Sequence, residues 1–215
     1  MKYILLLIIS FFSIFYYQHF YKKSPKNEQI KEVVQLDSGV IFKTSEKIPK
    51  VEFISHLGAK ITEESFLGNW SLFFFGYSHC PEFCPTIVKA MDEIGKNLSY
   101  SDMKYYFVSI DSLNDTPERL KEFLLDYSTF IIGLSGDYDQ MKNLSSFFKL
   151  TVEKAENQER HIEHSASLVL VSPSGYPVAL ITDYKNPKKI AKDIRFAQYY
   201  AQNHFEISDE KRRSF

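Results

Sequence analysis

Residues 72–85 read LFFFGYSHCPEFCP, an apolar run followed at once by a pair of cysteines. Leu72–Phe75 is apolar at every position, which is typical of a strand covered by helices on both faces. Pro85 suits the first turn of a helix, and apolar residues then recur at helical spacing, at Ile87, Val88, Met91, Ile94 and Leu98. The stretch therefore predicts a buried strand that turns directly into a helix, with both cysteines at the turn.

Cys80 and Cys84 are the only 2 cysteines in the sequence, and three residues separate them. A disulfide across so small a loop would remove only about 2 kcal/mol of unfolded-chain entropy, so structural stapling is a poor explanation of the pair. Two sulfurs this close can cycle between dithiol and disulfide, or they can bind one soft metal ion as thiolates. The spacing alone leaves both chemistries open.

The alternation of strand and helix continues on the carboxyl side of the cysteines. Capping signals at Thr116, Asp137 and Asn186 predict the starts of three more helices. Between and after these helices the sequence predicts apolar strands at 106–110, 130–134, 167–171 and 177–181. This order predicts an α/β domain with parallel crossovers and one antiparallel hairpin, which matches a thioredoxin-like sheet.

The first residues have a different character. Residues 3–20 read YILLLIISFFSIFYYQHF, and a helix of that length would be about 27 Å long, close to the ~30 Å of a bilayer core. The run ends in bulky residues, not in the small residues of a signal-peptidase site, which predicts an uncleaved single-pass anchor over residues 1–21. Composition then predicts a polar spacer with a hairpin at 22–49, the thioredoxin-like domain at 50–204 and a polar tail at 205–215.

Charge excludes one class of partner and leaves the membrane orientation open. The formal net charge is -1, with 26 basic and 27 acidic residues, so the chain has no electrostatic footprint for nucleic acid. Lys2 precedes the apolar run, whereas Lys22, Lys23 and Lys26 follow it, so the charge count alone would keep the domain in the cytoplasm. Long domains cross membranes largely regardless of such counts.

Three motifs together resemble the Sco/SenC family of copper chaperones. They are the Gly-aromatic-Ser-His-Cys-Pro-x-x-Cys-Pro stretch at 76–85, the stretch VSIDSLNDTPE at 108–118, and His164 just ahead of a strand. The resemblance covers roughly residues 50–200. It implies a membrane-anchored thioredoxin-like domain outside the cytoplasm. It also implies either delivery of copper to the dinuclear copper centre of cytochrome c oxidase or reduction of the cysteines of that centre.

The residues in these motifs have the chemistry that the resemblance implies. Cys80, Cys84 and His164 would supply two sulfurs and one nitrogen, a set that suits Cu(I), or Cu(II) with a fourth ligand, although zinc could also use it. We expect His164 to begin the hairpin strand that faces the cysteines. His79 could shape the cysteine loop or lower a thiol pKa, and Asp111 could support the ligands from behind. We interpret Asp115 as turn chemistry ahead of the Thr116 cap.

Two features favour metal binding over enzymatic thiol chemistry. Thioredoxin-type enzymes usually carry a cis-proline ahead of the strand that faces the dithiol, but this sequence has no proline between Glu118 and Ser172. The C-x3-C spacing also departs from the redox C-x-x-C. We therefore expect a metallochaperone in the cytoplasmic membrane, with its domain on the periplasmic or extracytoplasmic side. A copper donor and the copper-binding oxidase subunit would be its partners.

Other functions remain open from the sequence. The first alternative is a thiol-disulfide reductase that keeps the cysteines of the oxidase copper site reduced, with Cys80 and Cys84 as its redox pair. A weaker alternative is a copper- or redox-responsive signalling module. The sequence does not decide whether the chain is an enzyme.

Overall fold

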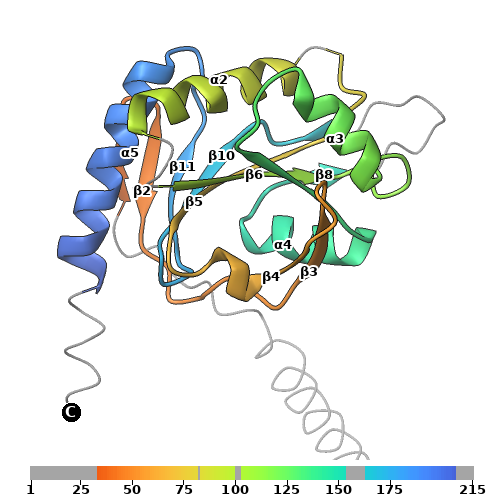
Figure 1. The fold of residues 1–215 in the computed structure, drawn as a ribbon. Helices are drawn as coiled ribbons and strands as arrows, with labels where there is room; N and C mark the ends of the chain where they lie inside the picture. Colours follow the sequence, from red (N-terminus) through yellow and green to blue (C-terminus); the bar gives the residue numbers. More distant parts are fainter. Residues whose placement is uncertain (1–32, 82, 100–102, 154–162, 207–215) are drawn as a thin grey trace, which may run out of the picture. The chain divides into compact units, whose positions relative to one another are not determined.

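The computed structural model describes residues 33–81, 83–99, 103–153 and 163–206, and Figure 1 shows their arrangement. Within this part of the chain, nine strands form one mixed sheet in the order β1-β2-β11-β10-β5-β6-β7-β3-β4. These strands are β1 (Val33–Gln35), β2 (Gly39–Phe42), β3 (Glu52–Ser55), β4 (Lys60–Thr62), β5 (Trp70–Gly76), β6 (Met103–Ser109), β7 (Ile131–Ser135), β10 (Leu168–Val171) and β11 (Pro177–Ile181). β5 pairs in parallel with β6, and β6 in parallel with β7.

The helices cover both faces of this sheet. α2 (Phe83–Leu98) and α3 (Pro117–Leu125) lie on one face, and α4 (Tyr138–Phe147) lies on the other (Figure 1). The steps from β5 to β6 and from β6 to β7 run in the same direction across the sheet, so two right-handed crossovers place α2 and α3 on the same side. α5 (Pro187–Ala201) packs against α2 and β11 and continues into η4 (Gln202–Glu206), while η2 (Glu63–Phe66) follows β4.

β5 lies at the centre of the core, and all seven of its residues are buried. Alternate side chains of β5 serve the two faces, as a strand requires. On one face Phe73 packs against Phe66, with ring centroids 4.9 Å apart. On the other face Phe74 packs against Phe107 at 5.9 Å. A strand buried on both faces is what the apolar run at 72–75 predicts, and this prediction is confirmed.

The sheet also reaches into the segment that composition assigns to a spacer. β1 and β2 form the predicted hairpin, and β2 pairs with β11 at the edge of the central sheet. The buried apolar residues of the described chain run from Leu36 to Phe205. The described residues belong to one compact unit, which therefore contains this whole core.

The hairpin lies alongside α5. At its turn, the backbone N–H and the hydroxyl of Ser38 both donate to the Asp193 carboxylate. At its open end, where Val33 pairs with Phe42, the following residue Lys43 places its ammonium 5.4 Å from the centre of the Phe205 ring. The chain therefore enters the domain beside the carboxyl end of α5.

Two regions differ from the sequence predictions or lie beyond the description. His164 belongs to the short strand β9 (Glu163–His164), which pairs with β8 (Val152–Glu153) in a separate two-stranded sheet. Three residues then separate His164 from β10, although we expected His164 to begin that strand. The predicted anchor at 1–21 lies outside the described residues. Among the residues that the structure does describe, no helix has both the length and the apolar composition needed to cross a bilayer.

Candidate metal centre

The two cysteines lie together where β5 gives way to α2. Cys84 is in the first turn of α2 and is fully buried, and Cys80 precedes the helix with 6% of its surface exposed. Both are free thiols, and the backbone N–H of Cys84 donates to the sulfur of Cys80 at 3.5 Å. The predicted turn from strand to helix thus brings the sulfur atoms of Cys80 and Cys84 together in the buried interior.

Gly76 leaves the space that the Cys84 sulfur fills. A Cβ atom at Gly76 would lie 2.8 Å from the Cys84 sulfur, 2.9 Å from a ring carbon of Phe74 and 3.1 Å from a ring carbon of Phe107. Real Cβ atoms essentially never approach other heavy atoms below 3.0 Å. Any larger residue at the end of β5 would therefore displace the thiol or the two rings that surround it.

The Cys84 thiol is held in its protonated form. Burial raises its pKa well above the ordinary value, and the negative charge of Asp115 acts in the same direction, while a hydrogen bond with the backbone of Tyr77 opposes them. The thiolate that the helix amino terminus should favour is therefore not stable here without a cation, because desolvation outweighs the helix dipole. A metal that binds Cys84 must displace its proton.

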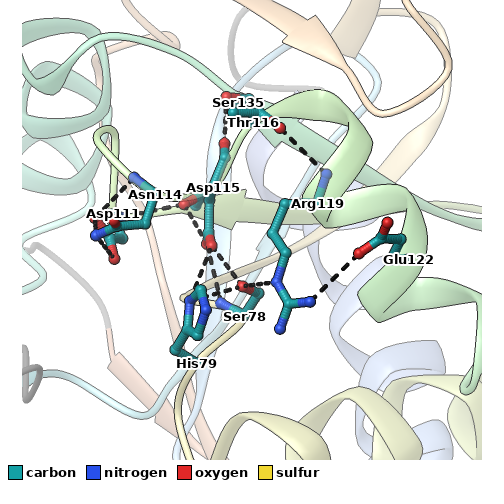
Figure 2. Close-up of polar contacts among 10 residues, drawn as sticks. Ser78, His79, Asp111, Asn114, Asp115, Thr116, Arg119, Glu122 and Ser135 are labelled. Carbon is teal, nitrogen blue, oxygen red and sulfur yellow. Dashed lines mark hydrogen bonds and ion pairs between the residues drawn. The ribbon is translucent and has the colours of Figure 1, made fainter.

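A buried carboxylate holds the cysteine loop in place (Figure 2). Asp115 is 1% exposed and accepts three hydrogen bonds, from the Ser78 backbone N–H at 2.9 Å, the Ser78 hydroxyl at 2.6 Å and the Ser109 hydroxyl at 2.7 Å. Arg119 of α3 donates from Nε to the Ser78 hydroxyl at 3.2 Å. We name the set of Asp115, Ser78, Ser109 and Arg119 the Asp115 latch. It ties the segment before Cys80 to the end of β6.

His79 and Asp111 both lie beside the cysteine loop and contact neighbours within it or within their own turn. His79 Nδ1 lies 3.2 Å from the Ser78 hydroxyl and 4.0 Å from an Asp115 carboxylate oxygen, so the ring shapes the loop. Asp111 accepts hydrogen bonds from the backbone and side chain of Asn114 within its own turn. One ligand atom from each of His79, Asp111 and Asp115 lies within 4.8 Å of the others, but Asp115 already accepts three hydrogen bonds.

The third predicted ligand, His164, is placed only by its backbone. It pairs with Val152 across β8 and β9, and its side chain lies outside the described residues. The next residue, Ser165, donates its backbone N–H to the carbonyl of Thr151 at 3.0 Å. The structure therefore brings Cys80 and Cys84 together, and whether His164 joins them stays a prediction.

Sequence reasoning missed the role of Asp115 and its partner Ser78. We read Asp115 as turn chemistry and gave the supporting role to Asp111, but the buried carboxylate is Asp115. A signal was present, because Ser78 and Asp115 follow β5 and β6, and the carboxyl ends of neighbouring parallel strands meet at one edge of a sheet.

We expect Gly76→Ala to lower the free energy of unfolding by about 1–3 kcal/mol through overpacking, and to change the rate at which the thiols are alkylated under native conditions. Denaturant unfolding and timed alkylation with mass spectrometry measure the two effects. Gly58→Ala is the matched control, because a Cβ there meets no atom within 4 Å although its φ of +83° carries strain. An alkylation rate equal to that of the unmodified protein would show that Gly76 does not position Cys84.

We expect Asp115→Asn to cost about 2–4 kcal/mol of unfolding free energy, because an amide cannot satisfy three donors as a carboxylate does. Asp111→Asn is the control and should cost less than about 1 kcal/mol, because its contacts are confined to an exposed turn. Chemical denaturation of both variants at neutral pH measures the difference. Equal losses would contradict the assignment of the latch to Asp115.

Comparison with known proteins places the chain among proteins with the same fold. Protein SCO2, mitochondrial, of Saccharomyces cerevisiae is 36% identical over 128 residues, which is 55% of this chain and 42% of that protein. The structure of Bradyrhizobium japonicum ScoI with copper bound is 25% identical with a TM-score of 0.64, and the match covers 71% of this chain and 99% of that one. BsSco, described as having a disulfide switch and as a member of the Sco family of cytochrome c oxidase assembly proteins, is 25% identical with a TM-score of 0.60, over 70% of this chain and 92% of that one.

The first curated relatives are longer proteins. The chain spans about half or less of the length of those it matches first. The match to the family model is broader, since it includes β3 through most of α5 and therefore the whole cysteine loop and the Asp115 latch. The model of the SCO1/SenC family matches residues 43–198, which is more than half of the sequence, and the chain therefore belongs to the SCO1/SenC family.

Proposed function

We propose that this protein is a membrane-anchored copper metallochaperone that binds one copper ion through Cys80, Cys84 and His164. It delivers the ion to the dinuclear copper centre of cytochrome c oxidase. The anchor is the apolar segment at 1–21, and the domain lies on the periplasmic or extracytoplasmic side. The copper donor and the copper-binding subunit of the oxidase are its partners.

The buried pair of thiols is the observation that carries this proposal. Two reduced sulfurs in one nearly water-free place, at the amino end of a helix, suit a soft monovalent ion better than a hard one. Dedicated catalysis would need a stable thiolate, whereas burial raises the pKa of Cys84. Membership of the SCO1/SenC family and the copper-bound structures of the Bradyrhizobium japonicum and Arabidopsis thaliana ScoI proteins support the choice of copper.

The surrounding residues determine how the ion would be held and released. The Asp115 latch fixes the loop on the amino side of Cys80, and α2 fixes Cys84, so the two sulfurs need little rearrangement to bind one ion. Entry of the ion displaces thiol protons, and the positive charge then sits close to the buried Asp115 carboxylate. Release follows when sulfur or nitrogen donors of the recipient replace those of this chain.

We expect reduced protein comprising residues 31–215 to bind one Cu(I) per chain in competition with a colorimetric Cu(I) chelator. Cys80→Ser, Cys84→Ser and His164→Ala should each weaken binding by more than the ~10–100-fold typical of the loss of an outer supporting group. His204→Ala is the control, because that exposed ring of η4 stacks on Tyr200 of α5 and takes no part in the site. The chelator titration gives the stoichiometry and the affinity together.

Two outcomes would contradict parts of this proposal. Unchanged Cu(I) affinity in His164→Ala would remove that residue from the ligand set and leave a two-sulfur site. Failure of the unsubstituted protein to hold copper against the chelator would remove copper binding altogether.

The alternative function is reduction of the disulfide in the copper site of the oxidase. It is favoured only by the proximity of two free thiols. It requires turnover of a disulfide substrate that depends on both Cys80 and Cys84 and not on His164. We expect this turnover to be slow wherever Cys84 must act as the thiolate, because its raised pKa leaves little of it ionised at neutral pH.

A further inference from the structure

The outer side of α5 carries a cationic and aromatic surface that the copper site does not use. Lys188, Lys192, Arg195 and Tyr199 follow one another at intervals of three or four residues, so they line one side of the helix. Phe196 lies beside them, and all five residues are exposed. We name this set the basic strip; its two aromatic residues, Phe196 and Tyr199, are 46% and 64% exposed.

No carboxylate of α5 shares this surface. The only acidic residue of the helix, Asp193, is partly buried and accepts two hydrogen bonds from Ser38 of the hairpin. Lys189 is offset from the basic strip, and Asp37 pairs with it at 3.6 Å. Among the described residues, Lys188 and Lys192 form no ion pair, so their charges are not neutralised. The basic strip is thus a concentration of positive charge in a protein whose net charge is only -1.

The combination of residues indicates the kind of surface that would cover it. Lys and Arg with long flexible stems and exposed Phe or Tyr on the same side of a helix are typical of helices that lie on a membrane surface. The amino groups reach anionic headgroups, and aromatic rings with one polar end settle at the interface. An acidic protein surface could use the same residues, because protein interfaces are also rich in aromatic residues and Arg, so the choice between the two occupants depends on the route of the chain.

The route of the chain favours the same surface. Val33, the first described residue, lies at the open end of the hairpin beside η4, which continues α5. Eleven residues, 22–32, separate it from the predicted anchor, and a chain of that length reaches at most about 40 Å. A tether of that length allows the carboxyl half of α5 to reach the bilayer surface.

We propose that the basic strip of α5 docks the domain on the anionic phospholipid surface of the membrane that anchors it. This inference rests on the proposed anchor of the previous section and adds a second, electrostatic attachment. The attachment involves the end of α2 opposite to the thiol pair: Arg195 donates to the carbonyl of Asn97 in the last turn of α2 at 2.8 Å, whereas Cys84 lies in the first turn. Asn97 and Cys84 are about 20 Å apart along α2.

The test uses residues 31–215, which hold the complete core but not the anchor, in flotation with lipid vesicles. We expect binding to equimolar phosphatidylglycerol and phosphatidylcholine, little binding to phosphatidylcholine alone, and release as salt is raised. Each basic side chain at an anionic surface contributes about a fivefold gain in partition, so Lys188→Glu/Lys192→Glu should lower binding by about 30-fold or more. Lys121→Glu/Lys142→Glu is the control, because it makes the same change in net charge on α3 and α4.

The outcomes separate this inference from copper binding. Loss of vesicle binding in the α5 variant alone, with its Cu(I) affinity and circular dichroism spectrum unchanged, is the expected result. Equal losses in both variants would reduce the effect to net charge and overturn the docking surface. Absence of binding to the anionic vesicles at low salt would also overturn it and leave an acidic protein as the occupant of the strip.

Discussion

Burial of β5 on both faces is the constraint that organises the rest of the molecule. Its seven residues, Trp70–Gly76, have neighbours in β10 and β6 and helices above and below, so the strand exposes neither an edge nor a face. The chain can leave such a strand only where the strand ends, and here a short loop leads into α2. The cysteines occupy that turn. Their position follows from the core, and their burial follows from the helix that covers them.

Asp115 provides the polar counterpart of this arrangement. The loop between β5 and α2 leaves the Ser78 backbone N–H without a partner in the sheet, and a buried N–H that lacks an acceptor is costly. A carboxylate from the next strand supplies that acceptor and binds two hydroxyl groups as well. A buried charge is tolerated because three donors replace water around it. Burial is the main cause of the raised pKa of Cys84, and the charge of Asp115 adds a small contribution in the same direction.

The sequence was sufficient for the elements whose pattern is local. The apolar run at 72–75, the caps at Thr116 and Asp137, and the antiparallel hairpin of the strands at 167–171 and 177–181 each depend on neighbouring residues, and each feature is confirmed. Features that depend on contacts between residues far apart in the sequence could not be predicted in this way. The sequence does not distinguish Asp111 from Asp115 as the carboxylate that supports the cysteine loop. Only the packing of β6 against β5 shows that Asp115 is the buried one. Likewise, β9 forms through pairing with Val152, which no periodicity around His164 signals.

In the proposed copper site, the different positions of the two thiols would give copper exchange an order. Cys84 is fully buried within α2, whereas Cys80 precedes the helix and retains a small exposed surface. A donor atom of a partner protein would therefore meet Cys80 first. Cys84 would leave the ion later, because the residues packed around it must move before a partner can reach its sulfur. The ion would thus pass through a state shared between Cys84 and the partner, because the sulfur that a partner reaches first and the sulfur that the fold shields are different atoms.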